Sequence, residues 1–197
     1  YRFDEVSSLA KVMSRIVSGQ VVTYPTTFIE GWTFLEIRQA LEAAEHLLQD
    51  SVELSDQEIL VAIGSDYAHP EGLFFPDTYY SVRGYSQLSM LDRAYRTMEE
   101  KLAYLWAGRK PGLPLASPYE ALILASIIEK EAGIDQERSQ ISGVLTNRLR
   151  QNIPLQTDPT VIYGLGSNFD GDLRTKHLTT EGPYNTYRRL GLPPTPI

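Results

Sequence analysis

The chain has 197 residues, of which 42% are hydrophobic, enough for one globular domain or for one domain with a small satellite. Its 18 basic and 25 acidic residues leave a net charge of −7, which disfavours binding to nucleic acid or anionic lipid through bulk electrostatics. Cysteine is absent, so disulfides and thiol chemistry are excluded, and the three histidines do not follow the spacing of metal ligands.

Both ends of the chain read as cut. It opens at "YRF", a strand-like piece, and stops inside a loop at "GLPPTPI". We therefore expect an internal fragment of a longer protein, whose N-terminal part can carry an anchor or a signal. Within the fragment, no apolar run reaches membrane-spanning length and no signal peptide is present.

The first part of the chain alternates between helical and extended patterns. Residues 7–18 place apolar side chains at helical spacing. The β-rich residues 21–31 follow, and Thr33 with Glu36 three places later then forms the capping box of a second helix. This alternation predicts a small α+β module over residues 1–50.

An aromatic stretch separates two further predicted helices. Residues 55–63 predict a short helix with a Ser-x-x-Glu cap, and residues 86–108 predict a long amphipathic one. Between them "HPEGLFFPDTYY", residues 69–80, is rich in proline, glycine and aromatic side chains. Two interpretations stay open for this stretch. It either holds a loop against the core or offers aromatic faces on which a sugar ring stacks.

A helix that is apolar on every side is predicted to begin after Ser117. Pro118 takes the first helical position, and Glu120 completes another Ser-x-x-Glu. The following "ALILASII" has no polar face, so we expect this helix to lie centrally in a core. Another helix is expected after Gly133, with four aliphatic side chains facing inward: Ile141, Val144, Leu145 and Leu149.

The last part of the chain, residues 153–197, is expected to be mostly loop. It contains many turn residues and little periodicity. Long irregular segments in a compact domain are usually functional, so we expect binding residues here.

Two glutamates end the apolar helix in "ASIIEKEAG", and helical geometry separates them. A helix turns about 100° per residue, so Glu131 continues the face of Leu124, Ile127 and Ile128. Glu129 continues a less bulky face. Desolvation by the aliphatic face and the negative end of the helix dipole both raise the pKa of Glu131. A carboxyl that is protonated near neutrality suits general acid chemistry.

A purely structural role is the alternative for both glutamates. Carboxylates are common at helix ends, and Lys130 or Arg138 can neutralise them. Arg148, on the following helix, can pair with either glutamate, reach a carboxylate of a ligand, or be an ordinary surface charge. The residues by themselves leave these alternatives open.

Three stretches of the second half closely resemble one family. They are "LASIIEKEAG", "ER…ISGVLTNRLRQNIPLQTDPTVIYGLG" and "PYNTYRRLGLPPTPI". They belong to a dense match over residues 121–197 that resembles the MltG (YceG-like) endolytic murein transglycosylases. Weaker similarity covers "EGLFFPDTYY" and "YRF…TFIEGWTFLEI", and the latter resembles the LysM-like module of that family.

The resemblance implies an α+β fold in two parts. A LysM-like module over residues 1–50 lacks its N-terminus, and a helix-rich catalytic domain with long functional loops over residues 51–197 lacks its C-terminal part. The family is anchored to the bacterial cytoplasmic membrane by one N-terminal helix, absent here, with its catalytic part on the extracytoplasmic side. The implied partners are peptidoglycan glycan strands and, as candidates, peptidoglycan synthases. Neither nucleic acid, metal nor organic cofactor is implied.

The resemblance also implies a reaction, the cleavage of glycan strands between N-acetylmuramic acid and N-acetylglucosamine that leaves a 1,6-anhydro end. The second glutamate of E-K-E, Glu131, is then the single catalytic acid and later the base. For each further loop residue, hydrogen bonding within its own loop is the alternative; Asp158 before Pro159, for example, is a natural turn starter. The residues expected to line the glycan groove are Gln156, Asp158, Tyr163, Tyr184, Asn185 and Tyr187.

Two rival functions stay open. A muramidase-type hydrolase needs a second carboxylate, for which Asp158 is the candidate. A non-catalytic peptidoglycan-binding or scaffold module would instead rely on the LysM-like part and the aromatic stretch.

Overall fold

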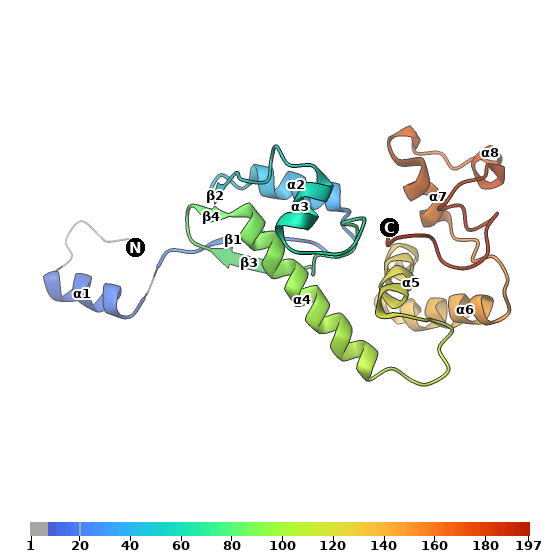
Figure 1. Cartoon of the computed structure of the whole chain (residues 1–197), viewed down its shortest axis with the longest axis horizontal. Coiled ribbons are helices and arrows are strands. Elements are labelled where there is room, and N and C mark those ends of the chain that lie inside the picture. Colours follow the sequence, from blue (N-terminus) through green and yellow to red (C-terminus); the bar gives the residue numbers. More distant parts are fainter. Residues whose placement is uncertain (1–7, 20) are drawn as a thin grey trace.

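The structure, a computed structural model, describes residues 8–19 and 21–197 of the chain. The strand-like "YRF" therefore lies outside the described residues. In Figure 1 the chain runs from α1 at one end, through a central part with strands and helices, to a helical part at the other end. The elements in chain order are α1 (Leu9–Val17), β1 (Tyr24–Thr27), α2 (Phe34–Ala43), β2 (Leu47–Leu48), α3 (Asp56–Ala62), β3 (Thr78–Ser81), β4 (Tyr85–Ser86), α4 (Gln87–Ala107), α5 (Pro118–Glu131), η1 (Asp135–Glu137), α6 (Arg138–Arg150), α7 (Asp158–Leu165), η2 (Gly166–Asn168) and α8 (Thr175–Thr179).

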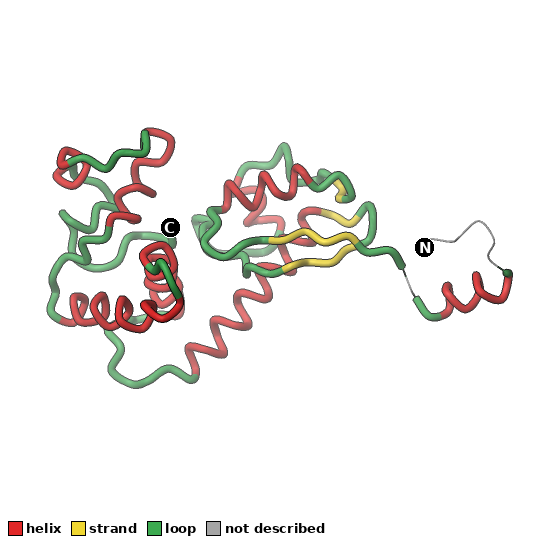
Figure 2. The backbone as a smooth tube through the Cα atoms, turned by 180° about the vertical axis from the view of Figure 1, so that it is seen from behind, coloured by secondary structure: helices red, strands yellow, loops and turns green. Residues whose placement is uncertain are grey.

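Small sheets combined with helices confirm the expected α+β class. β1 pairs with β3 in antiparallel fashion, and Tyr24 lies opposite Ser81. β2 runs parallel to β4, and Leu47 lies opposite Tyr85. Both pairs join a strand before residue 50 to a strand after it, so the expected domain boundary falls inside one hydrogen-bonded part of the chain. Figure 2 shows the strands, in yellow, in the central part of the chain.

The starts of α2 and α3 follow the capping patterns read from the sequence. The Thr33 hydroxyl accepts from the Glu36 N–H, and the Glu36 carboxylate accepts from the Thr33 N–H at 2.7 Å. Ser55 and Glu58 form the same reciprocal box at α3. Each box satisfies backbone donors that a helix start otherwise leaves free, and the two predicted helices are confirmed.

The apolar side chains gather in two clusters, and α5 contacts both. The first cluster draws on α2, α3, α4 and β3, and the second on α5, α6 and the C-terminal loop. Ile127 of α5 is fully buried in the second cluster, whereas Tyr119 and Leu122 pack against the first. This double contact explains why α5 has no polar face. We call residues 24–107 the first unit and residues 118–197 the second unit.

Much of the aromatic stretch, residues 69–80, packs into the first cluster. Phe74 is buried and stacks on Phe34 with ring centroids 4.9 Å apart. Tyr79 is buried as well, and its hydroxyl donates to the carbonyl of Phe75 at 2.6 Å. These contacts favour the interpretation in which the stretch holds a loop against the core.

The helix predicted over residues 7–18 forms as α1, but its burial differs from the expectation for an amphipathic helix. None of the side chains of α1 is buried, and Leu9 and Val17 keep 77% and 81% of their surface exposed. The periodicity therefore predicts the helix correctly. None of the helices in the described part of the chain combines the length and the hydropathy needed to cross a bilayer.

Residues 153–197 are mostly irregular, as predicted, although α7, η2 and α8 lie within them. α7 begins at Asp158 with Pro159 in its first turn, so the Asp-Pro pair opens a helix rather than a turn. Proline is tolerated there because its missing N–H has no partner inside the helix anyway. A correction concerns Val144 of α6, which was expected to face inward and is 55% exposed.

Ser81→Ala is expected to leave the free energy of unfolding unchanged, or to raise it by up to about 1 kcal/mol. Within residues 8–19 and 21–197, the buried Ser81 hydroxyl has no hydrogen-bond partner, so its removal relieves a desolvation cost. The matched control, Ser51→Ala, removes a buried hydroxyl that donates to Gln87 Oε1 at 2.7 Å. The control should lose about 1 kcal/mol. Urea unfolding measures both, and equal losses would contradict the prediction.

Candidate active site

Helix α5 carries Glu129 and Glu131 near its C-terminal end, on opposite sides of the helix. Two residues along a helix correspond to about 200° of rotation. Glu129 accordingly lines a cleft toward the first unit, whereas Glu131 lines a cavity toward α6. The two carboxyl groups therefore face different surroundings, and these surroundings indicate which of the two can act as an acid.

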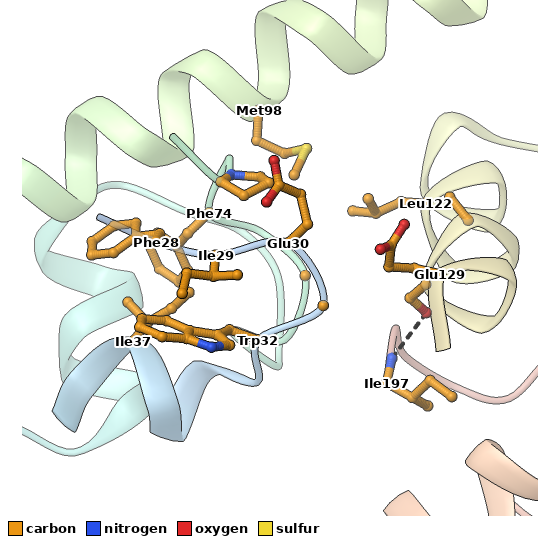
Figure 3. A pocket seen from close by; sticks show the side chains of 15 residues that line it. Phe28, Ile29, Glu30, Trp32, Ile37, Phe74, Met98, Leu122, Glu129 and Ile197 are labelled. Carbon is orange, nitrogen blue, oxygen red and sulfur yellow. Dashed lines mark hydrogen bonds between the residues drawn. The ribbon is translucent and has the colours of Figure 1, made fainter. Parts of the chain in front are cut away.

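The cleft at Glu129 lies between the two units and is mainly apolar (Figure 3). Trp32 of the first unit lies across from Leu122 and Ile197 of the second, around a volume of about 200 Å³. The Glu129 carboxylate accepts from Nη2 of Arg138 at 3.0 Å. Because this carboxylate is already paired with Arg138, a purely structural role fits Glu129 well.

Glu131 lies at the edge of a cavity of about 370 Å³. The other walls come from α6, through Val144 and Arg148, and from the loop before α7, through Gln156. The Glu131 side chain stays substantially exposed, so a ligand in the cavity can reach its carboxyl group. Val144, which was expected to be buried, is exposed because it forms part of this wall.

The electrostatic surroundings of Glu131 favour its protonated form. Partial burial raises the pKa of the Glu131 carboxyl above its ordinary value, and the negative charge of nearby Asp158 raises it further. A carboxyl with a raised pKa holds its proton to higher pH and suits general acid chemistry. The contribution of Asp158 does not follow from the sequence, in which only burial and the helix dipole indicate a raised pKa for Glu131.

Asp158 and Tyr187 form a hydrogen-bonded pair next to Glu131. The Tyr187 hydroxyl donates to Asp158 Oδ1 at 2.6 Å. This bond is the main cause that raises the pKa of Tyr187 to about 12, so the phenol keeps its proton and remains a donor. The charge of Glu131 also raises the pKa of Tyr187, so Glu131 acts electrostatically on this pair.

Gln156 reaches the same cavity from an unusual backbone conformation. Its φ of 56° lies in the left-handed region, which costs a non-glycine residue roughly 1 kcal/mol or more. Hydrogen bonds hold it there: its N–H donates to the Thr186 carbonyl at 3.1 Å, and its Oε1 accepts from Arg148 at 2.8 Å. Arg148 thus orients Gln156 instead of pairing with a glutamate, and strained residues of this kind cluster at functional sites.

The remaining three sequence candidates lie in hydrogen bonds within the protein. Tyr163 donates to Glu71 Oε2 at 2.8 Å, and Tyr184 shares a 2.8 Å bond with Thr195. The Asn185 amide is buried and donates to three carbonyls, two of them in α8 and the third that of Thr180 just after it. The structure therefore brings one set of candidates to Glu131 and leaves the other apart: Gln156, Asp158 and Tyr187 in the first set, Tyr163, Tyr184 and Asn185 in the second.

A buried threonine cluster under the cavity was missed in the sequence. Thr157, Thr160 and Thr186 share hydrogen bonds, the shortest of them 2.8 Å between Thr160 Oγ1 and Thr186 Oγ1. The cluster joins the start of α7 to the loop that carries Tyr187 and so fixes Asp158 and Tyr187 relative to each other. The only signal for it in the sequence was the pair of threonines on either side of Asp158-Pro159.

These features define the class of site: a carboxyl of raised pKa beside an open cavity, with amide and phenol groups around it, is equipped for general acid–base chemistry. Among the residues that the structure describes, no three His, Asp or Glu side chains are grouped so as to hold a metal ion. The chain belongs to the YceG-like family, whose family model matches residues 1–197. The resemblance noted in the sequence is thereby confirmed.

Individual relatives agree with this assignment. The endolytic murein transglycosylase of Bacillus subtilis (strain 168) is 28% identical to the chain over 214 residues, which cover the whole chain and 59% of that protein. The protein of the same name from Streptococcus pneumoniae (strain R6) is 30% identical over 131 residues, 64% of the chain and 23% of that protein. A crystal structure of a putative YceG-like protein from Listeria monocytogenes has a TM-score of 0.71 and 27% identity, and the match covers 95% of the chain and 67% of that structure.

Proposed function

We propose that the protein is an endolytic murein transglycosylase that cleaves peptidoglycan glycan strands. The observation that carries the proposal is the Glu131 carboxyl, of raised pKa, beside a cavity that it shares with Gln156 and next to Asp158. The names of the relatives from B. subtilis and S. pneumoniae support the same activity. The chain spans 59% and 23% of those relatives, so the activity of the whole protein is part of the proposal.

In the proposed mechanism Glu131 acts first as an acid and then as a base. Its carboxyl gives a proton to the glycosidic oxygen, and the bond from that oxygen to C1 of N-acetylmuramic acid breaks. The 2-acetamido group of the substrate stabilises the positive charge that develops at C1. The Glu131 carboxylate then takes the proton of the C6 hydroxyl as its oxygen attacks C1, which closes the 1,6-anhydro ring without consuming water.

Mass analysis of the products tests this reaction directly. Glycan strands digested by the full-length protein should yield fragments with anhydro ends, each lighter by one water than the matching reducing fragment. A product set made only of reducing ends would contradict the lytic reaction. That result would favour a muramidase-type hydrolase.

Asp158→Asn separates these two reactions through their pH dependence. Activity requires the protonated form of Glu131, so the rate should fall as pH rises through its pKa. Removing the negative charge of Asp158 lowers the pKa of Glu131, so this alkaline limb should move to lower pH. The amide oxygen can still accept from Tyr187, so the variant is expected to stay active below the shifted limb. Complete loss of activity at every pH would instead identify Asp158 as a second essential carboxylate.

The groove and the cellular setting belong to the same proposal. We propose that Gln156, Asp158 and Tyr187 contact the glycan strand and that the reaction takes place outside the cytoplasmic membrane, where peptidoglycan lies. We also retain the LysM-like module as a proposal. It is supported by the pairing of β1 with β3 and by α2 and α3, which lie between these strands in the sequence together with the short β2; this part of the chain runs past the expected residues 1–50 to Ser81.

A further inference from the structure

Glu71 is a buried carboxyl that the proposed mechanism does not use. It belongs to the stretch "EGLFFPDTYY", and only 8% of its surface is exposed. Its two oxygens accept from different units: Oε1 from the N–H of Phe34 at the start of α2, and Oε2 from the hydroxyl of Tyr163 in α7, both at 2.8 Å. One side chain thereby joins a helix start of the first unit to a helix of the second.

Gly72, the next residue, provides a second contact between the units. Its φ is +74°, and a Cβ built at this position would lie 2.6 Å from Cβ of Pro196. Such an approach leaves no room for any side chain at position 72. Because Pro196 is itself fully buried, the backbone of the first unit is pressed against an immobile ring of the second.

The connection to Glu131 runs through one short helix. α7 begins at Asp158, the residue whose charge raises the pKa of Glu131, and Tyr163 lies five positions later. Five residues of helix span about 8 Å. Because so short a helix moves as a rigid body, a displacement of Tyr163 also displaces Asp158. The bond between Tyr163 and Glu71 is a direct contact between this helix and the first unit.

The groups around Glu71 hold its carboxyl in one position and also determine its pKa. Burial raises the pKa of the Glu71 carboxyl, while the bonds from Tyr163 and Phe34 and the charge of Lys130 lower it. The charge of Glu36 raises it as well, and burial, the largest cause, leaves the pKa of Glu71 above its ordinary value. With both oxygens already accepting from fixed donors, the carboxyl has no freedom to bind a ligand, and its role is to position other groups.

We propose that Glu71, acting through Tyr163 and α7, is a positioning residue that sets the first unit against the second and holds Asp158 beside Glu131. This inference rests on the proposed function for its effect on catalysis, but its structural part does not. Glu71→Ala and Tyr163→Phe remove the two ends of one contact. Their effects should therefore not add in the double variant.

The structural part is tested by the distance between the units, measured with paired spin labels. The chain has no cysteine, so Val61→Cys and Leu190→Cys, at positions that are 68% and 53% exposed, label without a background in this chain. The parent should give one narrow distance distribution. Tyr163→Phe and Glu71→Ala should each broaden it, and the double variant should broaden it no further. Ser51→Ala, which loses a buried hydrogen bond inside the first unit only, should leave the distribution narrow.

The catalytic part is tested on the full-length protein with glycan strands as substrate. Tyr163→Phe should lower kcat by about tenfold with little change in KM, because misplacement of catalytic groups acts on the chemical step. It should also move the alkaline limb of the pH–rate profile to lower pH, since Asp158 no longer lies as close to Glu131. Glu71→Gln, which keeps an acceptor for Phe34 and an amide that can bond to the Tyr163 oxygen, should recover most of the parental kcat.

The outcomes separate the two proposals. The positioning role would be overturned, whatever the activity, if the label distance distribution stayed unchanged in both Tyr163→Phe and Glu71→Ala. It would also be overturned if the double variant broadened the distribution by the sum of the two single effects. Additive losses of kcat would indicate that Tyr163 touches the substrate directly. Failure of the proposed function would appear elsewhere, as a parent protein that forms no anhydro products while the labels still report a narrow distance. If Glu71→Ala does not fold, Tyr163→Phe and Glu71→Gln decide the question alone.

Discussion

Glu131→Gln is expected to lower the rate of glycan-strand cleavage by about 1,000-fold, within the range that general acid–base catalysis contributes. The amide has nearly the same shape as the carboxyl but cannot give a proton to the glycosidic oxygen. Binding of glycan strands should change little, because the side chain still fills its place at the edge of the cavity. The measurement is the release of anhydro fragments over time, together with a separate binding assay.

Glu129→Gln is the matched control for this variant. It makes the same chemical change two residues earlier on α5, where the carboxylate is paired with Arg138 and faces the apolar cleft. Loss of a partly exposed ion pair costs little, so the control should keep most of the parental rate. If Glu131→Gln released product as fast as the parent, Glu131 would not be the catalyst. A parent that bound glycan strands without ever cutting them would favour the scaffold function.

Gly72→Ala is expected to lower the free energy of unfolding by about 3 kcal/mol, the sum of two costs of similar size. A left-handed φ of +74° is unfavourable for alanine, and the new Cβ would overlap the buried ring of Pro196 at 2.6 Å. Proline has few ways to move aside, so the backbone itself would have to shift. Urea or thermal unfolding of the full-length protein measures the loss.

Gly84→Ala isolates the contribution of the contact. Gly84 has a similar φ of +82°, but nothing lies within 4 Å of the position of an added Cβ. This control should therefore lose only about 1 kcal/mol, from the backbone conformation alone. Equal losses at the two positions would show that the approach to Pro196 carries no energetic weight.

Local patterns in the sequence predicted local structure well. The reciprocal caps at Thr33 and Ser55 and the start of α5 at Ser117 were all read correctly, because a cap involves side chains only three residues apart. The rotation between Glu129 and Glu131 was likewise foreseen, since it follows from helix geometry alone. These features depend only on residues that are close together in the sequence.

Tertiary contacts set the limit of sequence reasoning. The bond between Glu71 and Tyr163 joins residues 92 positions apart, and no local pattern indicates it. The same holds for the pairing of Leu47 with Tyr85, which crosses the boundary expected at residue 50. For Tyr163, Tyr184 and Asn185 the sequence indicated polar loop groups but not their partners. A donor already engaged inside the protein looks the same in sequence as one that faces a ligand.

The spacing of the two glutamates on α5 has a consequence for how this helix can vary. Each residue added or removed turns everything beyond it by about 100° and moves it by about 1.5 Å along the axis. Deleting Lys130 would therefore rotate the Glu131 carboxyl away from its cavity, although no acidic residue had been lost. In this helix the count of residues matters as much as their identity, and an indel should be as harmful as the loss of the acid itself.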